Sequence, residues 1–162
     1  MLASKHVRLV VIGLVAVLAL GLLLYPSDEK RVREAADAIV TAANQDATEL
    51  HRALERHAVE DVSVTISDLP EPLQGRASLV AAAEHARVNG RKLRFRMEAV
   101  EINVEGNHAR VNAELVASLQ LGLRELRQAR HGVAMFEKID GRFPLVSAEV
   151  GSERHDQPEA RP

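Results

Sequence analysis

Two side chains of this 162-residue chain are placed where they could act as a general base. His131 shares strand parity with Val133 and Met135 and so could point into an apolar interior, and histidine titrates near neutral pH. Asp68 ends a segment in which apolar and polar residues alternate. We favour simpler interpretations for both: His131 as a hydrogen-bonded or solvated strand residue, and Asp68 as the cap of the Pro70 turn.

The histidines do not have the spacing of a metal site. His51 and His57 lie six residues apart, whereas His85 and His108 stand alone, so no i,i+4 or His-x-His pair is present among them. The chain has no cysteine, which excludes a disulfide scaffold, a thiolate metal site and a cysteine nucleophile. Glycine-rich phosphate loops and the Gly-x-Ser-x-Gly elbow are also missing. We therefore expect no metal and no cofactor.

A basic stripe is expected on one strand face. Lys92, Arg94 and Arg96 alternate with apolar residues, and Arg110 on the next strand could extend their row. The common interpretation is a solvated outer face, and the functional one is a surface for anionic lipid head groups or an acidic partner. A nucleic-acid binder is excluded, because the net charge is −2 and only Tyr25 and three phenylalanines could stack.

Residues 9–25 (LVVIGLVAVLALGLLLY) form an unbroken apolar run. Counted from Val7, a helix here would span roughly 28 Å, which matches the hydrocarbon core of a bilayer. The alternative is a cleaved signal peptide, but Leu24-Tyr25-Pro26 stands where a small-x-small cleavage site would be needed. The run predicts a transmembrane helix at 9–25.

Charge predicts the orientation of this helix. Lys5, Arg8 and the terminal amine lie on its short side, whereas the charges of residues 28–34 cancel. We expect a cytoplasmic tail at residues 1–8 and a single pass through the cytoplasmic (inner) membrane. The C-terminal domain would then be extracytoplasmic, in the periplasm of a double-membraned bacterium.

Residues 26–150 have the patterning of one α+β domain. Helices are expected at 28–44, from 46 onwards and at 77–88. Strands are expected at 62–67, 92–104, 109–119, 133–139 and 143–150, with a bulge where the apolar phase of 92–104 shifts. Asp140-Gly141 predicts a two-residue hairpin turn. Residues 151–162 are polar and are expected to be disordered.

Three short segments carry a family resemblance. They are Ala43-Asn44-Gln45-Asp46, Gln74-Gly75-Arg76 and Asp140-Gly141-Arg142-Phe143. With the order of the elements, they make residues 28–150 resemble the NTF2-like superfamily, which includes SnoaL-like cyclases and ketosteroid isomerases. The resemblance implies a cone of three helices packed on a curved antiparallel sheet, with a pocket between them and frequent dimerisation through the open sheet face.

The resemblance also implies where the catalytic groups of the pocket would lie. Asp68 falls about where ketosteroid isomerases carry their base, but the positions of the partner groups, near Ile39 and Met135, are apolar here. Seven apolar residues are predicted to line the pocket: Ile39, Phe95, Met97, Val111, Leu115, Val133 and Met135. Such a lining suits a small hydrophobic guest.

Three functions remain. The favoured one is a membrane-anchored, non-catalytic interaction domain or accessory subunit of an envelope complex, with a second copy or other membrane-complex subunits as partners. The second is a cone that binds a small apolar ligand. The third is an isomerase- or cyclase-type enzyme that uses Asp68 or His131.

Overall fold

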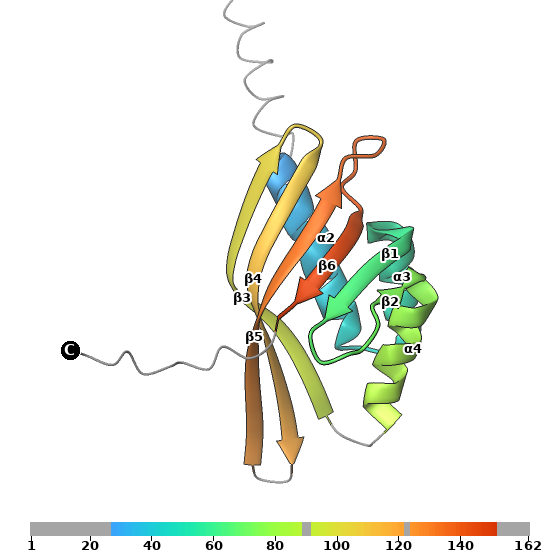
Figure 1. Cartoon of the computed structure of the whole chain (residues 1–162), viewed down its shortest axis with the longest axis vertical. Coiled ribbons are helices and arrows are strands. Elements are labelled where there is room, and N and C mark those ends of the chain that lie inside the picture. The colour runs from blue at the N-terminus through green and yellow to red at the C-terminus, as the bar shows by residue number, and fades with distance from the viewer. Residues whose placement is uncertain (1–26, 89–91, 122–123, 152–162) are drawn as a thin grey trace, which may run out of the picture.

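The computed structural model describes residues 27–88, 92–121 and 124–151, and the predicted tail 1–8, transmembrane helix 9–25 and residues 152–162 lie outside them. The described chain is α+β (Figure 1). The helices are α2 (Asp28–Ala43), α3 (Ala47–His57) and α4 (Gly75–Val88). The strands are β1 (Ala58–Ile66), β2 (Leu73–Gln74), β3 (Lys92–Glu105), β4 (His108–Leu121), β5 (Arg124–Glu137) and β6 (Leu145–Val150). Within the described residues, no helix is both long and apolar enough to cross a bilayer.

The first two helices begin at side-chain caps, as their sequences predict. The Ser27 hydroxyl accepts a hydrogen bond from the Lys30 amide at 3.2 Å, and Asp46 Oδ1 accepts one from the Glu49 amide at 2.8 Å. Both bonds satisfy an amide that has no partner within its own helix. The break between α2 and α3 is thereby confined to the short Asn44–Asp46 segment.

The sheet corrects one expectation, because it is mixed rather than antiparallel. Its strand order is β2-β1-β6-β5-β4-β3, and β1 runs parallel to β6 while the other neighbours are antiparallel. Alternation along a strand shows which residues share a face, but not the direction of the neighbouring strand. β1 also begins at Ala58, four residues before the expected start, and its register against β6 shifts between Ala58 and Ser63.

The predicted bulge and hairpin turn are confirmed. The β3–β4 register shifts between Glu98 and Glu101, and Ala99 there has a φ of 48°. At the β5–β6 turn, Asp140 and Gly141 have φ angles of 50° and 75°, the pattern of a type I′ turn. The bulge bends β3, and the turn returns the chain over the beginning of α2.

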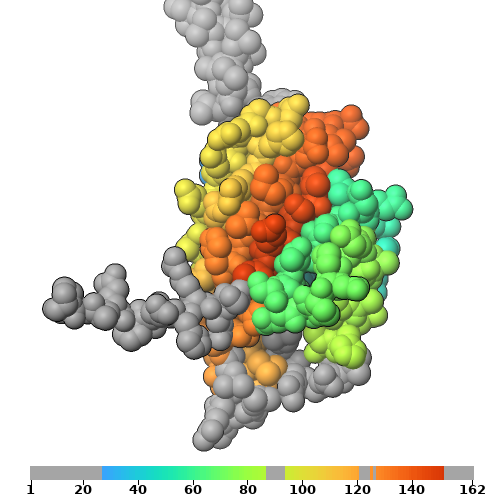
Figure 2. All heavy atoms as spheres, viewed as in Figure 1, coloured from blue at the N-terminus to red at the C-terminus, as the bar shows by residue number. Residues whose placement is uncertain are grey.

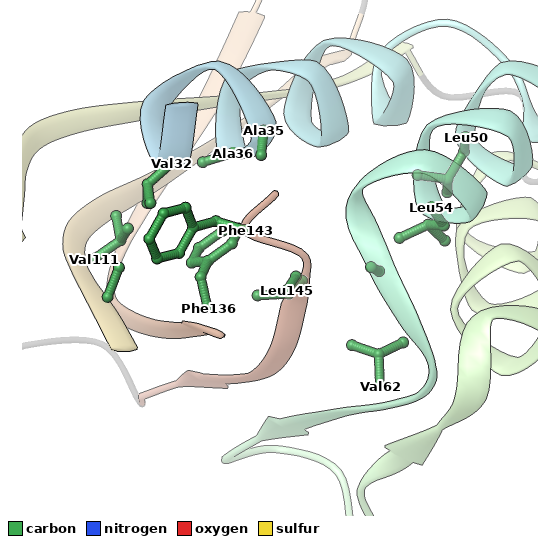
Figure 3. Packing of buried hydrophobic residues seen from close by; sticks show 12 residues of the cluster. Val32, Ala35, Ala36, Leu50, Leu54, Val62, Val111, Phe136, Phe143 and Leu145 are labelled. Carbon is green, nitrogen blue, oxygen red and sulfur yellow. The ribbon is translucent and has the colours of Figure 1, made fainter. Parts of the chain in front are cut away.

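The core lies between α2, α3 and one face of the sheet (Figure 3). Val32, Ala35 and Ala36 of α2 face Phe136 and Phe143. Leu50 and Leu54 of α3 and Val62 of β1 continue the same cluster. The apolar faces predicted for both helices are therefore the buried ones.

Candidate functional site

The described residues line a small cavity between helix α2 and the sheet. Its volume is about 60 Å³, with room for roughly two water molecules. Its walls are Ala36, Met97, Val111, Ala113, Leu115, Gly132, Val133, Ala134, Ala148, Glu149 and Val150. Ligand pockets usually measure about 300–1,000 Å³, so this cavity is far below that size.

Only part of the predicted pocket lining borders this cavity. Met97, Val111, Leu115 and Val133 border it, and Ile39 packs against the core instead. Phe95 and Met135 are each 37% exposed. Register nevertheless places Phe95 on the helix-facing side with Met97 and Leu115, whereas Met135 lies on the opposite face of the sheet.

The strand register corrects the predicted inward direction of Val133 and Met135, and it places the exposed His131 on the same side as Met135. Phe136, which is 2% exposed, faces the helices opposite the buried Ala109. Met135 is paired with Arg110 and therefore faces the other side of the sheet, and His131, paired with Glu114, shares that side. Val133 has the same parity, so it lies beside the cavity with its side chain directed to the open face.

Asp68 is held by an arginine. Arg130 Nη2 lies 2.5 Å from Asp68 Oδ2, and the exposed fractions of the two side chains are 18% and 56%. The neighbouring Ser67 donates its hydroxyl to the Val150 carbonyl at 3.2 Å, which fixes the end of β1 against β6. This arrangement gives Asp68 a structural partner and leaves it outside the cavity walls.

The predicted basic stripe is interrupted by acidic side chains. Glu98 binds Arg127 through both carboxylate oxygens at 2.8 Å and Arg96 Nε at 2.7 Å. Arg110 shares their face but is paired with Asn103, six residues along β4 from the partner of Arg96, or roughly 20 Å away. Arg94 is exposed on this face, whereas the side chain of Lys92 lies outside the description.

The open face of the sheet is the side opposite α2. In Figures 1 and 2 it is turned toward the viewer, with β4, β5 and β6 in front and α2 behind them. Register places on it Arg94, Arg96, Glu98, Glu101, Arg110, Glu114, Arg127, His131 and Met135. Among the described elements no helix is seen to cover β3–β5 on this side, so the face presents both charges and an exposed methionine.

The sequence analysis missed a larger hollow, which we call the cationic cleft. It measures about 770 Å³ and lies between α2, the end of α3 and the β5–β6 turn. It is lined by Arg31, Glu34, Ala35, Arg56, His57, Asp140, Gly141, Arg142 and Phe143. In the sequence, the one indication of this cleft is the basic pair Arg56-His57 in the last turn of α3. Basic residues are also common at that position because they interact favourably with the helix dipole.

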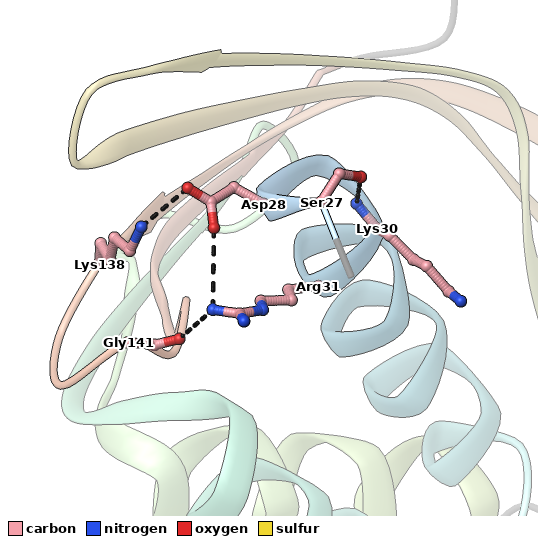
Figure 4. Close-up of polar contacts among 6 residues, drawn as sticks. All are labelled: Ser27, Asp28, Lys30, Arg31, Lys138 and Gly141. Carbon is pink, nitrogen blue, oxygen red and sulfur yellow. Dashed lines mark hydrogen bonds and ion pairs between the residues drawn. The ribbon is translucent and has the colours of Figure 1, made fainter. Parts of the chain in front are cut away.

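Polar contacts position one wall of the cationic cleft (Figure 4). Arg31 Nη1 donates to the Gly141 carbonyl at 2.9 Å, and Lys138 Nζ lies 2.8 Å from Asp28 Oδ2. These bonds tie the β5–β6 turn to the first turn of α2. The cleft therefore lies at the end of the domain where the described chain begins.

The electrostatics of the cationic cleft converge on His57. Burial, and then the positive charges of Arg56 and Arg142, hold the pKa of the His57 imidazole below its usual value. All three side chains line this cleft. The arrangement concentrates positive potential that an anion would neutralise.

No group of three metal-binding side chains gathers anywhere in residues 27–88, 92–121 and 124–151. The described part offers the cationic cleft, the Asp68–Arg130 pair and the open face, and a further hollow of about 430 Å³ between α2 and α3 shares Arg56 and His57 with the cleft.

Comparisons with known proteins agree with the fold. The sequence profile of the SnoaL-like domain matches residues 32–150, and no curated protein matches the chain. An NTF2-like protein with a cystatin-like fold from Novosphingobium aromaticivorans is 19% identical, with a TM-score of 0.70 over 90% of this chain and 92% of that one.

Two more distant structures are similar in the same way. A candidate dehydratase of the NTF2-like family from Streptomyces avermitilis is 18% identical, with a TM-score of 0.62 over 77% of this chain and 96% of that one. A candidate calcium/calmodulin-dependent protein kinase II association domain from Xanthomonas campestris is 11% identical, with a TM-score of 0.62 over 78% and 88%. At these identities the likeness shows the fold alone.

Proposed function

The chain belongs to the SnoaL-like domain family, and on that premise we propose that it is a membrane-tethered, non-catalytic interaction domain. Residues 9–25 would tether it to the cytoplasmic membrane with its N-terminus inside, and the domain would serve as an accessory subunit of an envelope complex. Its open face would pair with a second copy of the chain.

The small size of the interior cavity supports the non-catalytic part of this proposal. The cavity of about 60 Å³ has no room for a ring-sized substrate. Acid–base catalysis needs a titratable group within hydrogen-bond reach of a bound substrate. Asp68 instead binds Arg130, and His131 lies on the opposite face of the sheet.

The open face supports pairing with a second copy. Arg94 is exposed toward one end of the face, where Glu98 already binds Arg96 and Arg127. Glu101 and Glu114 lie nearer its middle. A two-fold axis would bring the cations of one copy toward the carboxylates of the other, as an isologous interface requires. Met135, which is 37% exposed, adds apolar area. The solved candidate association domain shows that this fold is also found in proteins named for assembly.

The test is native mass spectrometry of the full-length protein, extracted from its own membranes in mild detergent. We expect a dimer whose mass includes residues 1–26. Met135→Asp would place a charge in the interface and abolish the dimer. Leu69→Asp is the matched control, because Leu69 is 42% exposed on the loop that follows β1.

Each part of the proposal can fail separately. A mass that begins after residue 26 would overturn the tether. A monomer in the wild type, or a dimer that survives Met135→Asp, would overturn pairing through the open face. A complex with other proteins alone would overturn the choice of a second copy, and a stoichiometric small apolar ligand would replace the proposal with the ligand-binding cone.

A further inference from the structure

The cationic cleft gathers side chains from three separate parts of the chain. Arg31 comes from α2, Arg56 and His57 from the end of α3, and Arg142 from the β5–β6 turn. Planar guanidinium groups bind phosphate through paired, charge-assisted hydrogen bonds. A cleft of about 770 Å³ with three of them has room for a phosphate-bearing group.

The charges of the cleft favour an anion. Its acidic residues are Glu34 and Asp140, against three arginines. Glu34 Oε1 lies 4.0 Å from Lys30 Nζ, and Arg31 Nη1 lies 3.8 Å from Asp28 Oδ1, so Arg31 already has a carboxylate partner. Among the residues that the structure describes, no ion pair joins Arg56 or Arg142 to a carboxylate. The cations next to His57 therefore retain capacity for a ligand.

The position of the cleft indicates where that anion comes from. Only Pro26 separates the apolar segment 9–25 from Ser27, the cap of α2. The cleft residues of α2 lie between Arg31 and Ala35, which are three and seven positions after Asp28, the first residue of the helix. Along the helix axis they are therefore about 5–10 Å from its beginning. If segment 9–25 spans the bilayer, the cleft lies near the depth of the lipid head groups.

A neighbouring side chain fits the same surface. Ile139 begins the β5–β6 turn and is 44% exposed, directly before the cleft residues Asp140 to Arg142. Lys138 and Arg31 hold this turn against the beginning of α2. An exposed aliphatic residue beside cations is the combination that favours contact with an anionic membrane surface.

We propose that the cationic cleft binds the phosphate of an anionic phospholipid head group and thereby orients the domain on the membrane. This proposal rests on the membrane tether of the proposed function. Arg56 and Arg142 bind the phosphate oxygens, while Arg31 keeps the turn in place through the Gly141 carbonyl.

The experiment compares two probes on the full-length protein in a neutral detergent: phosphatidylglycerol, counted by native mass spectrometry, and inorganic phosphate, followed through the NMR signals of the His57 ring. We expect Arg56→Gln combined with Arg142→Gln to weaken phosphatidylglycerol binding at least about tenfold, because each lost hydrogen bond involves charged partners. The matched control is Arg33→Gln combined with Arg52→Gln, since both residues are exposed and neither lines the cleft. It should change binding less than about twofold.

The phosphate titration tests the cleft without the membrane. A bound anion stabilises the protonated imidazole, so phosphate should raise the pKa of His57, and the double cleft variant should abolish that rise. An unchanged His57 pKa together with equal lipid binding in all variants would overturn the site. A response to phosphate without retention of phosphatidylglycerol would overturn the lipid source.

Failure of the tether is detected by a separate measurement. Extraction of the full-length chain from membranes by alkaline carbonate would overturn the tether of the proposed function, whatever the His57 titration shows. Retention in the membrane with no difference between the cleft and control variants would overturn the cleft alone.

Discussion

The interior of the cone and the cationic cleft differ in size and in chemistry. The interior leaves about 60 Å³ among mostly apolar walls, whereas the cleft outside it has about 770 Å³ and three arginines. Among the described residues, the cleft at the end of the domain where α2 begins therefore offers a ligand more space than the interior cavity does. A shared fold therefore does not locate the functional site.

Side-chain size explains the difference. Ala35 and Ala36 of α2 face a sheet that presents Ala109, Ala113 and Gly132. Small residues on both sides let a helix approach a sheet closely, which leaves only a small cavity between them. At the cationic cleft, long polar side chains line the space between elements that diverge.

The largest effect on the free energy of unfolding is expected in the core. Phe136→Ala should lower the free energy of unfolding by about 3–5 kcal/mol, because Phe136 is 2% exposed and its loss leaves a cavity in the core. Met135→Ala, one residue earlier on the open face, should cost less than about 1 kcal/mol. Urea unfolding followed by circular dichroism measures both. Equal losses would show that the two faces of β5 are not distinguished as the register indicates.

An intermediate effect is expected at the end of β1. Asp68→Asn removes the partner of the largely buried Arg130 side chain and should lower the free energy of unfolding by about 1–3 kcal/mol. Asp61→Asn is the control, since Asp61 is exposed on β1 and forms no ion pair with the described residues. Thermal unfolding of the two variants decides the question. A stable Asp68→Asn protein would contradict the structural role and reopen the search for a base.

The smallest effect is expected at the cationic cleft, as a dependence of stability on pH. The pKa of His57 is lowered in the folded state, so the unfolded chain binds the proton first as the pH falls. The His57 ring contributes fully to the free energy of unfolding at a pH above its pKa in the unfolded chain. This contribution declines as the pH falls toward the pKa of the ring in the folded protein, and it is constant below that pKa. His57→Gln should remove this slope in urea titrations between about pH 7.5 and pH 5. An unchanged slope would show that another group causes it.

The local structure followed from particular residues. Ser27 and Asp46 begin their helices because a short polar side chain can satisfy a free amide, and Asp140-Gly141 turns because both positions accept positive φ angles. The phase shift after Met97 located the bulge. Each of these signals acts within a few residues of chain, so the sequence alone contains it.

The sequence does not show in the same way which face of the sheet each side chain of β5 occupies. Both parities of this strand carry apolar side chains, Val133 and Met135 on one and Ala134 and Phe136 on the other, so periodicity does not choose between them. The choice is made by pairing with β4, where Ala109 and Val111 already face the helices. Without that register, the sequence leaves open whether His131 points to the interior or to solvent.

By itself, the sequence determined the apolar segment at 9–25, the order of helices and strands, their caps and turns, and the family. These depend on local backbone preferences and on the burial of one face. Tertiary structure alone decided that β1 runs parallel to β6, that the cavity lined by Met97, Val111 and Leu115 is small, and that Arg31, Arg56 and Arg142 line one cleft. The three arginines are far apart along the chain, and only the packing of α2, α3 and the β5–β6 turn brings their charges together.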